Sequence, residues 1–136
     1  MTYILLSGAS FLIDKVTKVF LGASSVLSNG AVIAKVGNSM LATLAKRHQK
    51  PVVEFSETYK FSDRVNLDPI NINEIGDPHA LASYGAHKNV STLYVNLQGS
   101  LLKDWQSQKC LTLVNLKYDL TPAENISMVR FLILNP

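Results

Sequence analysis

The sequence contains a single cysteine, Cys110, among its 136 residues. One cysteine excludes the disulfide frameworks that hold together small secreted domains. No apolar run approaches the roughly 18 residues that a membrane-spanning helix requires, and residues 1–7 lack the basic start of a signal peptide. The phosphate-binding patterns GxGxxG and GxxxxGK[ST] are missing as well. We therefore expect no disulfide scaffold, no membrane partner and no P-loop or dinucleotide cofactor.

Charge is also scarce, because charged residues make up 17% of the chain and the net charge is only +3. The one dense basic run, residues 46–50, lies where a helix is expected to end, and cations there complement the helix dipole. We favour this interpretation over a phosphate-binding patch, and we expect no direct contact with nucleic acid. The 47% of hydrophobic residues is typical of one folded domain or part of one.

Short apolar runs alternate with amphipathic segments along the chain. The runs predict strands at residues 3–6, 16–21, 31–36, 52–55 and 111–114. Helices are predicted at 10–15, from Asn38 or Ser39 as N-cap to about residue 48, and from a capping box at 121–124 through Ile126, Val129, Arg130 and Ile133. The order strand, helix, strand over 31–55 predicts a parallel βαβ unit. The fold class is therefore α/β, with an open parallel sheet covered by helices on both faces.

Two parts of the chain depart from this alternation. Because the sequence begins in what is predicted to be a strand, we expect a fragment whose sheet is incomplete at its N-terminal side. Residues 66–100 show no periodicity apart from the strand-like run 93–97. A stretch of this length without regular structure is expected to be a functional lid or a mobile insertion.

Acidic residues mark the carboxyl ends of two predicted strands, where open α/β sheets place their sites. Glu54 and Glu57 lie at the end of one strand, and Asp119 precedes the last helix. Two carboxylates brought together there could act as acid and base. The alternative, which we favour, is that Asp119 binds backbone N–H groups or a nearby lysine and fixes its loop.

The remaining reactive side chains show no ligand spacing. His48 is placed on the inner stripe of a helix, whereas His79 and His87 lie in the irregular stretch. Cys110 begins a predicted strand, so a buried structural role is expected. No metal site is predicted. Gly30 and Gly37 could cradle an anion near a helix N-terminus, but turn formation is the simpler role for glycine.

Three blocks of the sequence resemble one family. They are VFLGASSVLSNGAVIAKVG at residues 19–37, ETYKFSDRV at 57–65 and NLKYDLTPAE at 115–124. The blocks resemble the superfamily that joins the regulatory subunits of eukaryotic translation initiation factor 2B with methylthioribose-1-phosphate isomerase and ribose-1,5-bisphosphate isomerase. The resemblance covers residues 2–65 and 101–136, and the second and third blocks are most similar to the delta-type subunit.

The resemblance implies a fold and a function. Residues 1–136 would form the C-terminal Rossmann-like domain, without the family's N-terminal helical domain and first strands. The implied function is that of a non-catalytic regulatory and assembly subunit of the guanine-nucleotide exchange factor that acts on translation initiation factor 2. Implied partners are the other subunits and the phosphorylated alpha subunit of initiation factor 2, in a cytoplasmic dimer or higher oligomer without cofactors.

The same resemblance provides an alternative function, a sugar-phosphate aldose–ketose isomerase. The isomerases carry a catalytic Asp where this sequence has Ser24, and an Asn where it has Ala34. A hydroxyl cannot replace a carboxylate in moving protons at neutral pH, and Cys110 does not match the catalytic cysteine. Lys35 and Asp119 remain as candidates for a degenerate sugar-phosphate pocket, or they pair within the crevice.

Overall fold

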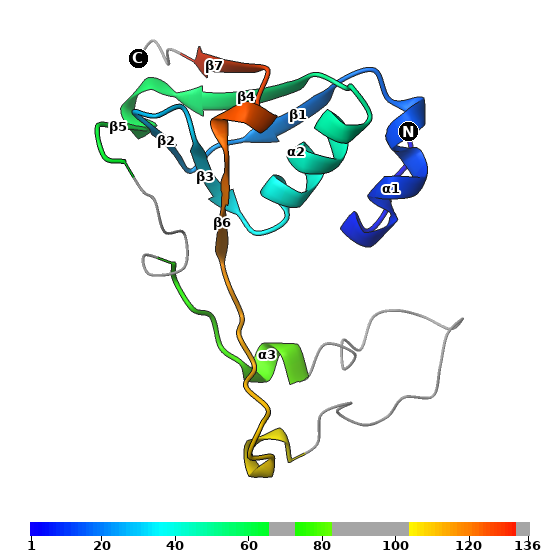
Figure 1. The fold of residues 1–136 in the computed structure, drawn as a ribbon, viewed down its shortest axis with the longest axis vertical. Coiled ribbons are helices and arrows are strands. Elements are labelled where there is room, and N and C mark those ends of the chain that lie inside the picture. The colour runs from blue at the N-terminus through cyan, green and yellow to red at the C-terminus, as the bar shows by residue number, and fades with distance from the viewer. Residues whose placement is uncertain (66–72, 83–103, 133–136) are drawn as a thin grey trace. The chain divides into compact units, whose positions relative to one another are not determined.

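The structure is a computed structural model that describes residues 1–65, 73–82 and 104–132. The chain divides into two compact units, of which the first comprises Met1–Asn73 and Tyr118–Pro136 and the second Glu74–Lys117. Both sheets and the longest described helix belong to the first unit (Figure 1).

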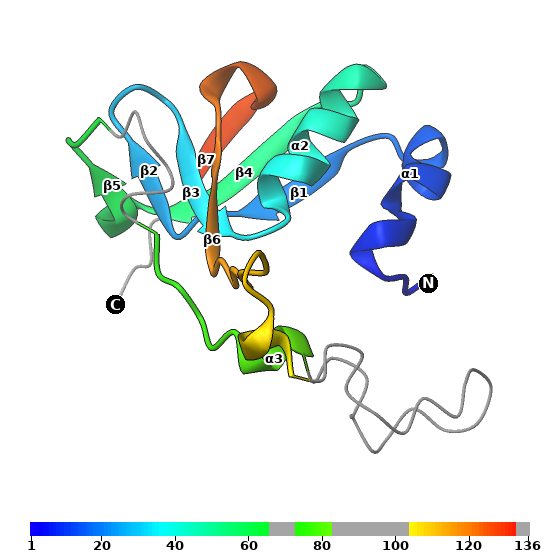
Figure 2. The same ribbon diagram turned by 60° about the horizontal axis from the view of Figure 1, so that its bottom comes forward.

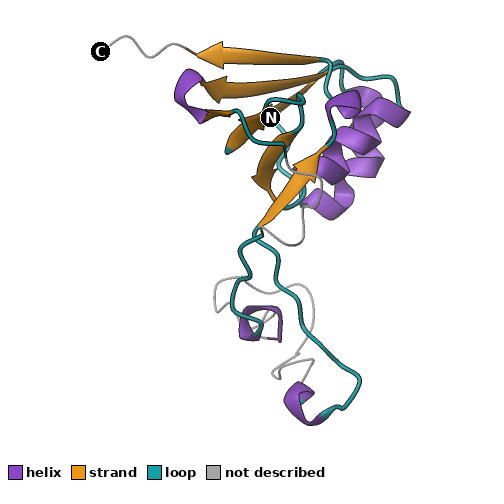
Figure 3. Cartoon of the chain, turned by 60° about the vertical axis from the view of Figure 1, so that its left-hand side comes forward, coloured by secondary structure: helices purple, strands orange, loops and turns teal. Residues whose placement is uncertain are grey.

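The elements are coloured by type in Figure 3. The described strands are β1 (Val19–Gly22), β2 (Ser25–Leu27), β3 (Val32–Lys35), β4 (Val52–Glu57), β5 (Phe61–Ser62), β6 (Tyr118–Thr121) and β7 (Met128–Leu132). The α-helices are α1 (Ala9–Leu12), α2 (Asn38–Arg47) and α3 (His79–Ala82). Short 3₁₀ turns occur at Leu6–Gly8, Ile13–Lys15, Thr58–Lys60, Trp105–Ser107 and Ala123–Asn125.

A three-stranded parallel sheet in the order β1-β4-β7 forms the centre of the first unit. One face of β1 and β4 is apolar at Val19, Leu21 and Val52, and α2 packs on it through Ala42 and Ala45 (Figure 2). The predicted α/β fold with a parallel sheet is thereby confirmed. The helices expected on the second face of the sheet are not among the described residues, and Phe20 and Met128 on that face are 62% and 56% exposed.

The second sheet, in the order β5-β2-β3-β6, is mixed. β3 pairs antiparallel with both β2 and β6, while β2 pairs parallel with β5. The predicted βαβ unit over 31–55 is therefore wrong in its pairing, because β4 joins β1 instead of β3. The hairpin β2–β3 turns at Asn29 and Gly30 as expected, and the Asn29 side chain accepts a hydrogen bond from the N–H of Ala31.

The predicted strand at residues 3–6 is also wrong. This segment leads into the 3₁₀ turn Leu6–Gly8 and then α1, and Tyr3 and Leu5 are exposed. A strand is stable only when a neighbour pairs with it, and none of the described strands does so here. The helix predicted at 10–15 corresponds to α1 and the turn Ile13–Lys15.

The predicted final helix is likewise wrong, because Thr121 closes β6 and β7 follows a single turn at Ala123–Asn125. β7 pairs in parallel with β4 over Val53–Glu57. Apolar residues at 128–132 fit a strand as well as a helix stripe, so their spacing alone does not decide the element. Ile133 lies outside the described residues.

The described residues of the second unit form α3, the turn Trp105–Ser107 and one isolated β-bridge between Ile75 and Leu116. The predicted strand at 111–114 is wrong, since these residues have no regular structure, and Cys110 is exposed instead of buried. α3 falls inside the stretch 66–100, where no helix was predicted. Residues 66–72 and 83–100 of that stretch, which include the strand-like run 93–97, lie outside the described residues.

Candidate functional site

Asp119 of β6 joins the mixed sheet to the start of α2. It lies directly opposite Ala34 in the β3–β6 pair. Its Oδ2 atom accepts hydrogen bonds from the backbone N–H groups of Gly37, at 2.7 Å, and Ser39, at 3.0 Å. The first N–H groups of a helix have no partner within the helix and carry a partial positive charge, so a carboxylate is stabilised there.

The expected N-cap, Asn38 or Ser39, is wrong. The N-cap of α2 is Gly37, which has no side chain to accept a hydrogen bond from the helix. The Asn38 amide instead donates to the carbonyl of Gly22. Asp119, 80 residues away in the sequence, supplies the acceptor instead. The sequence favoured this role for Asp119, the binding of backbone N–H groups. The segment that Asp119 fixes, however, is α2 and not its own loop.

Glu54 of β4 is the second acidic residue, and the region around the carboxyl groups of Glu54 and Asp119 is called the crevice below. It projects from the face of β4 that also carries Val52 and Ser56, and its side chain has no exposed surface. Neither carboxylate oxygen of Glu54 has a hydrogen-bond partner, nor has the buried Oδ1 atom of Asp119. Burial raises the pKa of Glu54 from 4.5 to about 7, and the negative charge of Asp119 adds to this rise.

The arrangement can hold and release a proton near neutral pH. Acids and bases that act in catalysis have pKa values in this range, but buried structural carboxyls have them too. The buried hydroxyl of Thr121, two residues beyond Asp119 on β6, also lacks a partner. Among residues 1–65, 73–82 and 104–132, no group of three or more His, Cys, Asp or Glu side chains could hold a metal ion.

Of the other residues singled out from the isomerase resemblance, Ala34 lies opposite Asp119, whereas Ser24 and Lys35 are exposed. Lys35 is opposite Tyr118 in the antiparallel pair, so its side chain leaves the sheet on the face away from Ala34 and Asp119. Ala34 is fully buried in the apolar cluster with Ala23, Val26 and Val32.

Glu57 is separated from Glu54 as well. It forms an ion pair of 2.6 Å with Lys60, and the hydrogen bond from Lys60 lowers the pKa of Glu57. The Lys60 ammonium also donates to the carbonyl of Ala23. The acidic pair in the crevice is therefore Glu54 with Asp119.

The histidines and the basic run have local roles. His48 is the C-cap of α2 and is half-buried, like Leu41 and Leu44 on the predicted stripe, and its Nδ1 lies 2.6 Å from Oδ1 of Asp14. The basic run ends α2 as predicted, and the ammonium groups of Lys46 and Lys50 donate to backbone carbonyls. His79 packs edge-on against Trp105 within the second unit, and His87 lies outside the described residues.

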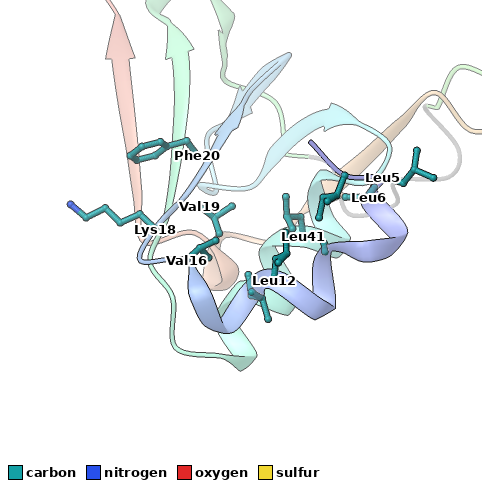
Figure 4. A pocket seen from close by; sticks show the side chains of 11 residues that line it. Leu5, Leu6, Leu12, Val16, Lys18, Val19, Phe20 and Leu41 are labelled. Carbon is teal, nitrogen blue, oxygen red and sulfur yellow. The ribbon is translucent and has the colours of Figure 1, made fainter. Parts of the chain in front are cut away.

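An apolar hollow of about 440 Å³ separates the N-terminal segment from β1 and α2 (Figure 4). Leu5, Leu6 and Leu12 line one side, and Val19 and Leu41 line the other. A second hollow of about 530 Å³ lies on the open face of the parallel sheet, lined by Lys18, Phe20, Pro51, Val53, Phe55, Ser127, Met128 and Arg130. Both hollows are dominated by carbon atoms, so they suit apolar groups better than sugar phosphates.

The sequence pointed to Glu54 as a candidate but not to its burial. The burial could have been predicted, because residues 52–57 alternate inward and outward along the strand and Glu54 occupies an inward position between Val52 and Ser56. The effect of the Asp119 charge on Glu54 could not be predicted in the same way, since it depends on how β6 packs beside the start of α2.

The chain matches the model of the Initiation factor 2 subunit family over residues 1–130. It belongs to this family. Curated relatives include the translation initiation factor eIF2B subunit delta of Dictyostelium discoideum, 47% identical over 94% of this chain and 20% of that protein. The same subunit of Schizosaccharomyces pombe is 35% identical over 93% of this chain and 26% of that protein. The chain thus spans a fifth to a quarter of these relatives.

Solved structures of family members share the fold. The subunit delta of translation initiation factor eIF-2B from A. fulgidus aligns with a TM-score of 0.69 at 21% identity, over 94% of this chain and 33% of that one. The 5-methylthioribose 1-phosphate isomerase from Pyrococcus horikoshii aligns with a TM-score of 0.67 at 19% identity, over 93% and 31%. At such identities the likeness shows the fold alone, and regulatory subunits and isomerases share that fold.

No described helix is long and apolar enough to cross a membrane.

Proposed function

We propose that this chain is the Rossmann-like part of a delta-type regulatory subunit of the exchange factor for translation initiation factor 2. The observation that carries the proposal is the 47% identity with a curated delta subunit over 94% of the chain. The proposed role is assembly and regulation in the cytoplasm, without catalysis and without a cofactor. The proposed partners are the other eIF2B subunits and the phosphorylated alpha subunit of initiation factor 2.

Association is supported by one relative and by the surface of this chain. A tetrameric eIF2B-beta2-delta2 complex from C. thermophilum has the same fold, with a TM-score of 0.61 and 24% identity. The open sheet face of this chain exposes Phe20 and Met128 beside the cations Lys18 and Arg130. Exposed apolar patches of this kind are typical of interaction surfaces.

Co-expression with a beta-type subunit tests this proposal. We expect one co-purifying complex, sedimenting as a heteromer, that retains the phosphorylated alpha subunit of initiation factor 2 more strongly than the unphosphorylated one. Phe20→Asp, on the open face, should weaken the complex at least tenfold. Val114→Asp is the matched control, because Val114 is 54% exposed but belongs to the second unit. A chain that stays monomeric with every subunit tested would refute the proposal.

The isomerase remains the second candidate because the fold of a solved isomerase matches. Against it, position 24 carries a serine and position 34 a buried alanine. A degenerate sugar-phosphate pocket at Lys35 and Asp119 is not favoured, because the two side chains leave opposite faces of the β3–β6 pair.

A further inference from the structure

The face of the parallel sheet that points away from α2 carries apolar side chains in register. Phe20 of β1, Val53 of β4 and Met128 of β7 are direct neighbours across the three strands. Phe55 lies two residues beyond Val53 on the same face, and its ring meets that of Phe20 edge-on, with 5.5 Å between the ring centres. Figure 4 shows Phe20 on the side of β1 opposite Leu41 of α2. The four side chains on this face line the hollow of about 530 Å³.

Two cations lie at diagonally opposite corners of this face. Lys18 precedes Phe20 by two residues and is level with Pro51, at the edge formed by β1. Arg130 is paired in register with Phe55, at the edge formed by β7. Both cations line the hollow, and none of the described residues that line it is acidic. In the described part of the chain, neither cation takes part in an ion pair.

We propose that this face binds an amphipathic α-helix of a partner protein, whose apolar side covers Phe20, Val53 and Met128 and whose acidic side chains pair with Lys18 and Arg130. The proposal rests on the proposed function for the identity of the partner as another subunit, and it adds the chemistry of the segment that binds. A helix is the expected occupant because parallel sheets are almost always covered by helices on both faces. α2 covers the other face.

The charges of the face count against a second copy of this chain as the occupant. A symmetric dimer brings the same surface of both copies together. The cations Lys18 and Arg130 of each copy would then meet a surface without an acidic residue. Opposite charges across an interface give specificity, whereas like charges reduce affinity. A helix with acidic residues provides the opposite charges, and its apolar side fills the hollow.

The geometry of the rings counts against single-stranded RNA. RNA bases stack on exposed aromatic rings beside cations. The planes of Phe20 and Phe55 are 76° apart, so the two rings do not form one platform for successive bases. Their neighbours Val53 and Met128 are aliphatic, which suits the apolar side of a helix better than a base.

The positions of the two cations predict the spacing of the acidic residues. Lys18 and Arg130 are four residues apart along the strands and lie on the two outer strands of the sheet, so their Cα atoms are about 16 Å apart. An α-helix spans this distance in about 11 residues, which is close to three turns and keeps both acids on one side. Gly22 leaves a third corner of the face open, because a Cβ there would meet no atom within 4 Å.

A designed peptide tests this proposal on the 136-residue chain. The probe is an α-helical peptide of alanine and glutamine, with leucines along one side and two glutamates about 11 residues apart on that side. A matched peptide carries lysines in place of the glutamates. By fluorescence anisotropy at low salt, we expect the glutamate peptide to bind at least tenfold more tightly than the lysine peptide. Phe20→Asp should weaken its binding at least tenfold. Equal affinities for the two peptides, or unchanged binding in Phe20→Asp, would overturn the proposal.

Charge reversal on the chain tests the two cations. In Lys18→Glu/Arg130→Glu the preference should invert, so that the lysine peptide binds more tightly. Arg64→Glu/Lys109→Glu is the matched control, because it changes the net charge equally at exposed positions outside the hollow. This control should keep the preference for the glutamate peptide. An unchanged preference in Lys18→Glu/Arg130→Glu would overturn the proposal.

Two further measurements test the other occupants. Tighter binding of an oligouridine than of the glutamate peptide would overturn the proposal in favour of RNA. Self-association that is lost in Phe20→Asp would overturn it in favour of a second copy. The peptide assay contains no other subunit, so its failure is distinct from failure of the proposed function. A chain that joins a beta-type subunit but does not distinguish the peptides would refute the acidic helix alone. A chain that prefers the glutamate peptide but joins no subunit would support the acidic helix and refute the proposed function.

Discussion

At the scale of single residues, Asp119 is the contact on which α2 depends. It joins a helix start and a strand that are about 80 residues apart in sequence. We predict that Asp119→Ala lowers the free energy of unfolding by about 2–3 kcal/mol, because two buried N–H groups lose a charged acceptor. Urea denaturation measures this value. Asp63→Ala, at an exposed aspartate, should change it by less than about 0.5 kcal/mol.

The pH dependence of stability follows from Glu54. Its pKa is about 7 in the folded chain and 4.5 when exposed, so the folded chain binds more protons between these values. Stability therefore falls as the pH rises from 4.5 to 7, by about 3 kcal/mol at most. Unfolding free energies at several pH values should show this fall in the unmodified chain. The fall should be absent in Glu54→Gln, and a fall of equal size in that variant would contradict the assignment to Glu54.

The start of α2 requires the unusual backbone conformation of its N-cap residue, Gly37. Its φ of 108° lies in the region that side chains disfavour, and a Cβ there would collide with the flexible end of Leu6. We predict that Gly37→Ala lowers the free energy of unfolding by about 1–2 kcal/mol, chiefly through the backbone strain. Gly22→Ala is the matched control, because a Cβ at that position meets no atom within 4 Å. Equal losses in both variants would show that φ is not the cause.

At the scale of elements, the segment from β6 to β7 forms two strands joined by a turn, whereas its sequence suggests a helix. Thr121 ends β6 with a buried, unpartnered hydroxyl, whereas the Ser127 hydroxyl accepts the N–H of Val52. We predict that Thr121→Val, which removes the hydroxyl but keeps the shape, leaves the melting temperature unchanged or raises it. Ser127→Ala should lower stability by about 1 kcal/mol. A clear loss in Thr121→Val would indicate a helix cap at this position instead.

The strands β1 and β4 and the helix α2 could be predicted because short apolar runs and a clear amphipathic stripe define them locally. β4 and α2 lie within two residues of their predicted bounds. The conformations of segments 3–6 and 121–132 could not be predicted, because their apolar residues fit both a helix and a strand. Which of the two forms depends on whether a neighbouring strand is present to pair with the segment. β4 provides that neighbour for β7, and no described strand provides one for residues 3–6.

The crevice could be predicted only in part, and for a related reason. Asp119 was recognised as a residue that binds backbone N–H groups, since acidic residues before a helix commonly do so. The sequence could not indicate that the N–H groups belong to Gly37 and Ser39. Such a contact depends on how the two sheets pack against each other, and no local sequence pattern indicates this packing.

At the scale of the whole molecule, the fold is compatible with both a regulatory subunit and an isomerase, so the residues of the crevice must decide. A working isomerase requires an acid and a base beside its substrate. The crevice offers Glu54 and Asp119, but Glu54 is fully buried and Oδ2 of Asp119 is already engaged with α2. Ser24 lies exposed outside this crevice. Asp119 is thus placed to hold the start of α2, and Glu54 has no surface that a sugar could reach.

The final prediction concerns catalysis directly. We expect no turnover of methylthioribose-1-phosphate by the chain, and none after Ser24→Asp. One added carboxylate provides at most a general acid–base factor of roughly 10²–10⁴, and only where substrate is already positioned. Position 34 would still carry a buried alanine in place of the amide, and Lys35 would still point away from Asp119. A coupled assay of ketose formation with both proteins tests this, with a known isomerase as the positive control. Turnover by the unmodified chain would establish it as an enzyme, and turnover that appears only with Ser24→Asp would show that the pocket has kept everything except its acid.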